Sequence, residues 1–136
     1  GIAYAVDLAI TGDEGDKLPA TIQEIAPVRN ATQVPAQTQV YVDLLAGNTG
    51  VIIIDGLELE TVNLDEVRAE AKPGQQIELP LTTIYEPGNA TLTFRPTAGS
   101  SIERFSEGEH VVEVIYWSVV EGRGSARSFS WTFSVF

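Results

Sequence analysis

Residues 109–120, EHVVEVIYWSVV, and residues 126–136, ARSFSWTFSVF, decide the fold class of this chain. In the second stretch Phe129, Trp131 and Phe133 alternate with serine and threonine. A period of two directs one side of an extended strand toward a core and the other toward solvent. The first stretch is apolar on both faces, as is typical of a central strand. Together they predict a core built from β-sheet.

Shorter extended segments precede this pair of strands. Residues 51–54 and 57–60 flank Asp55-Gly56, and this dipeptide tolerates the positive φ angles of a two-residue hairpin turn. Other strands are expected over residues 21–28, 38–45, 75–81 and 90–95. About eight or nine short strands separated by turns predict an all-β domain of the immunoglobulin-like Greek-key β-sandwich class.

One helix is expected inside this β-domain, over residues 64–71. Asn63 can cap its start, and Glu66 three residues later completes a capping-box pattern. Pro73-Gly74 ends it. A helix of two turns usually covers one end of a sandwich.

Composition excludes several kinds of function. The 136 residues include 19 acidic and 8 basic side chains, a net charge of −11, which opposes binding to nucleic acid or to anionic lipid. No cysteine is present, so disulfides, thiolate catalysis and cysteine-ligated metal sites are excluded. The chain also lacks methionine, which indicates either a processed protein or a fragment of a longer one.

The order of signals from residue 22 to residue 136 resembles a known family. These signals are Pro27, Val34-Pro35, residues 92–96 (LTFRP), residues 108–114 (GEHVVEV) and residues 128–135 (SFSWTFSV). In this order they resemble a bacterial Ig-like domain of the S-layer and cell-surface protein type. The resemblance implies a spacer, an adhesive module or a wall component on a cell surface.

Copper-binding periplasmic proteins have a similar sandwich but use several histidine and methionine ligands. This chain has one histidine and no methionine, so copper binding is not expected from the resemblance. No cofactor and no metal site are predicted. Asp13, Glu14 and Asp16 could ligate calcium, but their spacing is not that of an EF-hand.

No catalytic residue is predicted, and the chain is not expected to be an enzyme. A Ser-His-Asp triad would have to use His110, the only histidine, and no nucleophile-elbow pattern accompanies it. We expect His110 to be a half-buried ring at the end of the core. The acidic residues, such as Glu58 and Glu60, alternate outward and are interpreted as solvated surface.

Two other kinds of surface site are candidates. Asn30-Ala31-Thr32 and Asn89-Ala90-Thr91 fit the N-glycosylation acceptor pattern, and both fall at expected turns, which makes Asn30 and Asn89 candidate glycosylation sites. Tyr41 and Trp117 lie opposite the core faces of their strands. They either pack against covering segments or form an exposed platform for stacking sugars.

The chain divides into an amphipathic strand over residues 1–11, an acidic glycine-containing linker over residues 12–20 and the sandwich over residues 21–136. The first strand either pairs within its own sandwich or is exchanged with a neighbouring subunit to build a filament. Its apolar face, the candidate surface for strand exchange, consists of Ile2, Tyr4, Val6, Leu8 and Ile10.

From these observations we expect a non-catalytic structural or adhesive domain of an extracellular surface protein, with assembly into filaments as one form of that role. The alternative is a carbohydrate- or ligand-binding module of a secreted protein. Expected partners are other proteins or further copies of the chain, with no nucleic acid and no membrane insertion. The expected location is extracellular or at the cell surface. The sequence does not specify the partner, the organism or the oligomeric state.

Overall fold

A computed structural model describes residues 18–136, except residues 75, 77 and 78. Ten strands, a helix α2 and a 3₁₀ turn η1 follow one another in it. Their bounds are β1 (Ile22–Ala26), β2 (Ala31–Val34), β3 (Val40–Leu44), β4 (Asn48–Ile54), β5 (Leu57–Glu58), β6 (Thr61–Asn63), α2 (Leu64–Glu70), β7 (Thr83–Glu86), β8 (Thr91–Phe94), β9 (Gly108–Ser118), η1 (Arg123–Ser125) and β10 (Arg127–Val135).

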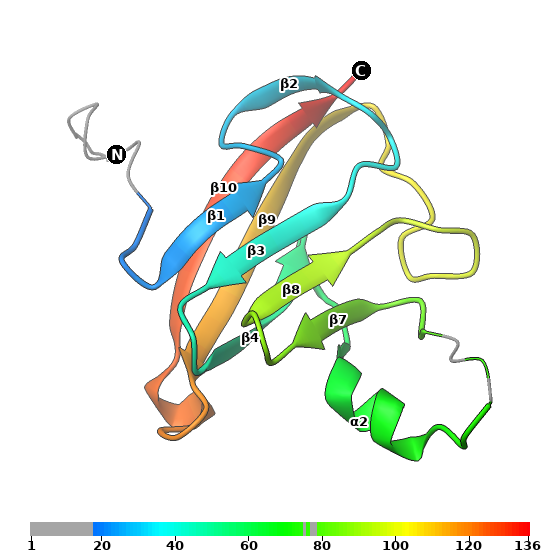
Figure 1. The fold of residues 1–136 in the computed structure, drawn as a ribbon. Coiled ribbons are helices and arrows are strands. Elements are labelled where there is room, and N and C mark those ends of the chain that lie inside the picture. The colour runs from blue at the N-terminus through cyan, green and yellow to red at the C-terminus, as the bar shows by residue number, and fades with distance from the viewer. Residues whose placement is uncertain (1–17, 75, 77–78) are drawn as a thin grey trace.

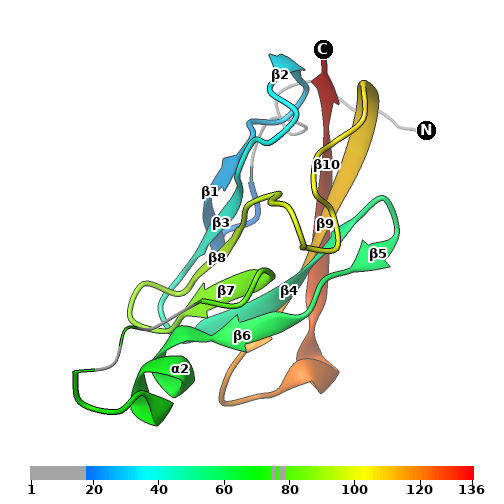
Figure 2. The ribbon, with the colours of Figure 1, turned by 90° about the vertical axis from the view of Figure 1, so that its right-hand side faces the viewer.

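The strands form two five-stranded sheets that lie face to face (Figure 1). The first sheet has the order β1-β3-β8-β7-β6 and the second has the order β2-β10-β9-β4-β5. Figure 2 shows the two layers from the side, with α2 beyond one end of them and β2 near the C-terminus at the other. The predicted immunoglobulin-like Greek-key sandwich with one short helix is confirmed.

The two stretches that decided the fold class pair with each other. β9 and β10 run antiparallel over nine consecutive residue pairs, from Arg127↔Tyr116 to Val135↔Gly108. Their inner side chains meet those of β3 and β8 in one core. The buried members of the core that alternation predicts are Val40, Val42, Leu92, Phe94, Val112, Val114, Trp131 and Phe133. Phe129, which the same pattern places with them, is only half-buried and packs at the margin of the core.

The hairpin and the helix form as their local signals predict. Asp55 and Gly56 have φ angles of 51° and 87°, and Ile54 pairs with Leu57 across the turn. The Asn63 side-chain oxygen accepts hydrogen bonds from the backbone N–H groups of Asp65 (2.9 Å) and Glu66 (3.4 Å), which fixes the start of α2.

Of the strand expected over residues 75–81, the structure describes residues 76 and 79–81, and none of these is in a strand. Leu79 and Leu81 are 49% and 51% exposed, and the strand in this region is β7, where Thr83 and Tyr85 point inward. Pro80 explains the shift, because it has no N–H to donate to a neighbouring strand. β7 instead pairs with both β6 and β8.

The first residues of the chain lie outside the part that the structure describes. The division into residues 1–11, 12–20 and 21–136 therefore stays a prediction, as does the pairing of Ile2 to Ile10. The described part begins just before β1, which lies at an edge of its sheet and ends before Pro27. Within the described residues, no helix has both the length and the apolar character that crossing a membrane requires.

We predict that Gly50→Ala destabilises the domain. A Cβ at Gly50 would overlap the Ile115 carbonyl oxygen and lie 3.2 Å from the Tyr116 Cα, both backbone atoms of β9. Such overpacking forces strands apart, and we expect a loss of about 1–3 kcal/mol in the free energy of unfolding, measured by urea denaturation.

Gly88→Ala is the matched control, because no atom lies within 4 Å of its added Cβ. We expect a change of no more than about 0.5 kcal/mol there. Equal effects of the two substitutions would show that the close approach of β4 and β9 at Gly50 is not required.

Candidate functional site

At one end of the sandwich, His110 of β9 connects its strand with the β4–β5 turn and with the segment that precedes β9. Its Nδ1 lies 2.6 Å from Asp55 Oδ2, and its Nε2 lies 2.7 Å from the carbonyl oxygen of Ser106. The ring packs against Phe105 and Phe133, with centroids 5.0 and 5.6 Å away. His110 thus lies at the end of the core, as expected, and is more fully buried than expected, at 7% exposed.

The two contacts of His110 favour its charged form. A carboxylate and a carbonyl oxygen both accept hydrogen bonds, and a neutral imidazole can donate from only one nitrogen. Burial alone would lower the pKa of His110, but the hydrogen bonds to Ser106 and Asp55 and the charge of Asp55 outweigh it, so the pKa lies above its usual 6.5. Because both nitrogens are engaged, the ring offers no lone pair to a metal or to a substrate proton.

Asp55 also binds the backbone of β9. Its Oδ1 accepts a hydrogen bond from the Val111 N–H (2.8 Å), and its own N–H donates to the Val111 carbonyl oxygen (2.8 Å). The β4–β5 turn is therefore fixed to the start of β9 by backbone and side chain together. The arrangement of His110 and Asp55 is suited to holding the fold, and we assign it a structural role.

A larger hollow lies where the chain crosses from β5 to β6. This hollow, called the β4 groove below, has a volume of about 500 Å³. Trp117 and the buried Tyr85 are among the residues that line it, together with three acidic residues, Glu58, Glu60 and Glu66. Its volume is in the usual range for binding sites in proteins.

The backbone acceptors of β4 beside this groove are already occupied. β5 pairs only with Ile53 and Ile54, so the rest of β4 has no strand on that side. The Ile52 carbonyl oxygen instead accepts from the Leu59 N–H (2.9 Å). The carbonyl oxygens of Gly50 and Asn48 accept from the hydroxyl groups of Thr61 (3.4 Å) and Tyr85 (2.7 Å). A bound molecule would therefore contact mainly side chains here.

Arg123 of η1 occupies part of the β4 groove. Its guanidinium carbon lies 5.3 Å from the centroid of the Trp117 ring, and its Nη2 lies 3.3 Å from Glu58 Oε1. The side chains of Arg123 and Glu58 are 52% and 50% exposed, so water screens the pair. The groove thus already holds one cation between an aromatic ring and a carboxylate.

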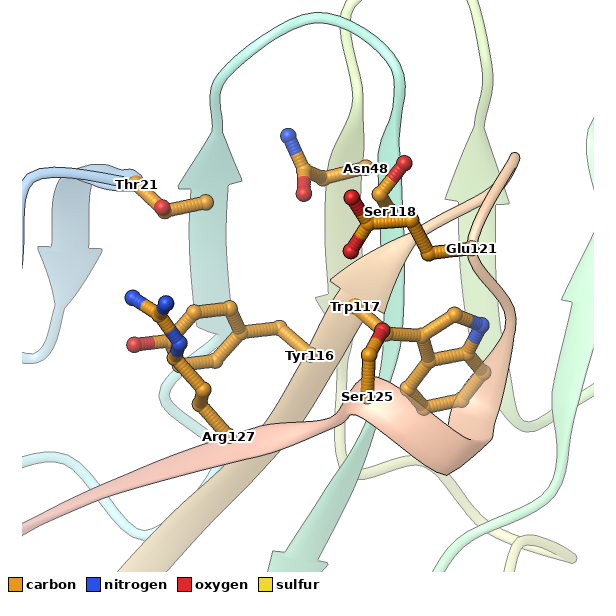
Figure 3. A pocket seen from close by; sticks show the side chains of 8 residues that line it. All are labelled: Thr21, Asn48, Tyr116, Trp117, Ser118, Glu121, Ser125 and Arg127. Atoms are coloured by element: carbon orange, nitrogen blue, oxygen red, sulfur yellow. The ribbon is translucent and has the colours of Figure 1, made fainter.

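A smaller polar pocket of about 230 Å³ lies on the other side of the loop that joins β9 to β10 and contains η1 (Figure 3). In the figure the Arg127 guanidinium lies near the Tyr116 hydroxyl, and the Glu121 carboxylate points toward Asn48 and Ser118. Among the ion pairs of the described residues, none joins Arg127 to Glu121. Among the described residues that line the pocket, no hydrogen bond joins a serine hydroxyl to the Glu121 carboxylate, and no set of metal ligands is present.

The candidate surface sites are distributed around the sandwich. Asn30 is exposed in the turn before β2, and its N–H donates to the Thr132 carbonyl oxygen (2.8 Å). Asn89 is exposed between β7 and β8 and donates to Glu86 (3.1 Å). The structure brings neither asparagine to the β4 groove. Asp13, Glu14 and Asp16 lie outside the described residues, as do Ile2, Tyr4, Val6, Leu8 and Ile10.

Sequence reasoning missed the residues that form the β4 groove. Glu58 and Glu60 were interpreted only as solvated surface, and Arg123 was not considered. The sequence signal that could have indicated this site is Gly122-Arg123-Gly124, which places a basic residue in an expected turn shortly after the long apolar strand. Tyr41 is half-buried and lies outside the groove, whereas Trp117 lines it with Arg123 over its ring.

Comparison with known proteins gives only distant similarities. No protein-family model and no curated protein sequence matches this chain. Among solved structures, CopC from Methylosinus trichosporium OB3b is 14% identical, with 84% of this chain and 90% of that chain covered and a TM-score of 0.48. PcoC, a copper resistance protein from Escherichia coli, is 9% identical, with 85% and 98% covered and a TM-score of 0.49.

These comparisons correct the function expected from the sequence. A structural, adhesive or filament-forming surface role was predicted, with carbohydrate or ligand binding as the alternative, and both predictions were wrong, because the similar solved structures are CopC and the copper resistance protein PcoC. The β-sandwich part of the resemblance is confirmed. The finer assignment to the S-layer type has no support from a family model. The guanidinium over Trp117 also occupies the ring on which a sugar would have stacked.

We predict that the domain is more stable at pH 6 than at pH 8.5. A histidine whose folded pKa is raised contributes its full stabilisation below the unfolded value of about 6.5 and loses it as the pH rises through the folded pKa. Loss of about 1 kcal/mol would lower the melting temperature by roughly 3–5 °C for a domain of this size. Thermal unfolding at the two pH values measures the effect.

Asp55→Asn is the matched control, since asparagine tolerates the positive φ of this turn but removes the charge. We expect a smaller difference between the two pH values and a lower His110 pKa, which NMR can follow because the chain has one histidine. An unchanged pH dependence in this variant would contradict the role assigned to the His110–Asp55 pair.

Proposed function

We propose that this chain is a non-catalytic protein-interaction domain that binds a basic segment of a partner protein in the β4 groove. The observation that carries the proposal is that Glu58, Glu60 and Glu66 line the same groove as Trp117, where the Arg123 cation already lies between the Trp117 ring and Glu58. Carboxylates beside aromatic faces favour cationic side chains, through ion pairing and through the attraction of a cation to an aromatic ring.

The charge of the whole domain supports a basic partner. A net charge of −11 raises the rate at which a basic segment meets this surface and disfavours acidic partners. Within the groove, Arg123 is the one cation against the three glutamates. A basic segment would therefore gain contacts in the groove itself in addition to the attraction of the surface as a whole.

The backbone geometry supports recognition through side chains. A partner that added a strand to β4 would need free carbonyl oxygens along that edge. Those of Asn48, Gly50 and Ile52 already accept hydrogen bonds from within the domain. We therefore propose that the partner's basic side chains, rather than its backbone, provide most of the affinity.

The absence of catalysis is part of the proposal. His110 has both nitrogens engaged, and in the polar pocket beside Arg127 the Ser125 hydroxyl donates to the Gly122 carbonyl oxygen and not to a base. We also propose that the domain works outside the cytoplasm, which is the broad form of the extracellular location expected from the sequence. We propose only this broad location. Attachment to a cell surface and the S-layer type were expected from the sequence resemblance and are not part of the proposal.

Copper is not proposed as a ligand of this chain. Within the described residues, no group of three or more histidine, cysteine, aspartate or glutamate side chains could hold a metal ion. The soft ligands that copper favours are absent, because the sequence contains no cysteine and no methionine. The single imidazole is held by Asp55 and Ser106. The residues that the structure describes thus do not fit a copper site.

We predict that removing divalent metals leaves the stability of the domain unchanged. The core and the His110–Asp55 contact need no metal ligand, so we expect equal melting temperatures with and without EDTA, measured at one pH. A fall of several degrees on adding EDTA would contradict this prediction and would point to Asp13, Glu14 and Asp16.

We predict that a short capped peptide of alternating arginine and glycine binds in the β4 groove. Amide chemical shifts should change mainly at groove residues such as Thr49 and Thr61 and at the Trp117 indole. Replacing Glu58, Glu60 and Glu66 together by glutamine should weaken binding by roughly tenfold or more, because three charge-assisted contacts are lost.

The control replaces Glu24, Glu107 and Glu109 by glutamine. These three residues are exposed and lie outside the β4 groove, and the change in net charge is the same. The control variant should bind the peptide nearly as well as the unmodified protein. Equal weakening in the two variants, or shift changes spread over the whole surface, would reduce the interaction to general electrostatic attraction and refute the proposed site.

A further inference from the structure

The position of Arg123 is fixed by the loop that carries it. The loop between β9 and β10 closes through hydrogen bonds from the Gly122 N–H to the Ser118 carbonyl oxygen (2.9 Å) and from the Ala126 N–H to the Arg123 carbonyl oxygen (3.0 Å). The Ser125 hydroxyl also donates to the Gly122 carbonyl oxygen (2.9 Å). Gly122 has a φ of 83°, which a glycine adopts without strain. These bonds direct the Arg123 side chain into the β4 groove.

The contacts that Arg123 makes there are those that an incoming guanidinium would make. Its guanidinium carbon lies over the Trp117 ring, and its Nη2 reaches the Glu58 carboxylate. The guanidinium group is planar, stacks on aromatic rings and donates in a fixed fork, whereas an ammonium group is a compact, strongly hydrated charge. The geometry of this position therefore fits arginine better than lysine.

These contacts hold Arg123 only weakly. About half of each side chain in the Arg123–Glu58 pair is exposed, and exposed ion pairs contribute little to stability. η1 contains no buried residue, and the hydrogen bonds that close the loop are made by its backbone and by Ser125, so the Arg123 side chain can leave the groove without breaking them.

We propose that Arg123 is a built-in occupant of an arginine-binding position formed by Trp117 and Glu58, and that an arginine of the partner protein displaces it. This inference rests on the proposed function and adds the regulation of its site. Competition from Arg123 lowers the affinity for every basic partner. It thereby restricts binding to partners that present an arginine together with further contacts to Glu60 and Glu66.

The test compares the unmodified domain with Arg123→Ala, using N-acetyl-arginine amide as the probe. The Trp117 indole resonance reports occupancy of the position. We expect the variant to bind this probe roughly three- to tenfold more tightly, as removal of one exposed cation–π contact and one exposed ion pair implies. N-acetyl-citrulline amide, which has nearly the same shape but no charge, should not bind either protein.

Arg127→Ala is the matched control, because it removes a nearby arginine at the start of β10 that does not line the β4 groove and changes the net charge by the same amount. Its affinity for the probe should equal that of the unmodified domain. A similar gain in Arg127→Ala would attribute the effect to net charge, and an unchanged or weaker affinity in Arg123→Ala would make Arg123 a part of the site. Either result would overturn the inference.

The two proposals can fail separately. If the arginine–glycine peptide binds in the β4 groove but Arg123→Ala gains nothing, the displacement of Arg123 is refuted and the protein-binding role stands. If the peptide binds in the groove of neither the unmodified domain nor Arg123→Ala, the proposed function itself is refuted.

Discussion

The structure depends on the position of β9 in the middle of the second sheet. This strand hydrogen-bonds to β10 over nine residue pairs and to β4 over seven, so both of its edges are occupied for most of its length. Val112 and Val114 on its inner face are completely buried against the first sheet. Because β9 contributes to the core, to the His110–Asp55 contact and, through Trp117, to the β4 groove, a disturbance of its pairing would reach all three.

Those parts of the fold that arise from local chemistry could be predicted from the sequence. Alternation in residues 126–136 was sufficient to identify β10, and Asp55-Gly56 was sufficient to identify the hairpin, since both residues adopt the positive φ angles that its turn requires. The segment over residues 75–81 has the same alternation, but there the absence of an N–H at Pro80 outweighs the pattern. The partner of each strand in the two sheets is a non-local choice, and no local pattern specified it.

The candidate site was much harder to predict. Glu58, Trp117 and Arg123 come from β5, β9 and η1, and they meet because β5 and β9 lie on the two sides of β4 in the second sheet, although Glu58 and Arg123 are 65 residues apart in the sequence. Likewise, the hairpin turn alone accounted for Asp55 in the sequence. Its second role, as the hydrogen-bond partner of His110, depends on the fold and could not be predicted from the local pattern. The function expected from a resemblance to surface proteins was wrong, because a sandwich fold supports many unrelated functions.

The four edge strands of the described sandwich share one property that bears on its behaviour at high concentration. β1, β2, β5 and β6 contain five, four, two and three residues, while the long strands β4, β9 and β10 lie in the interior of the second sheet. Long, flat edges are the usual templates for amyloid-like association between copies of a protein. In this domain each outermost strand offers at most five residues to extend, on a surface of like charge, although β2 and β5 cover β10 and β4 only in part. The short outermost strands and the like charge of the copies both oppose the joining of sheets in a crowded environment.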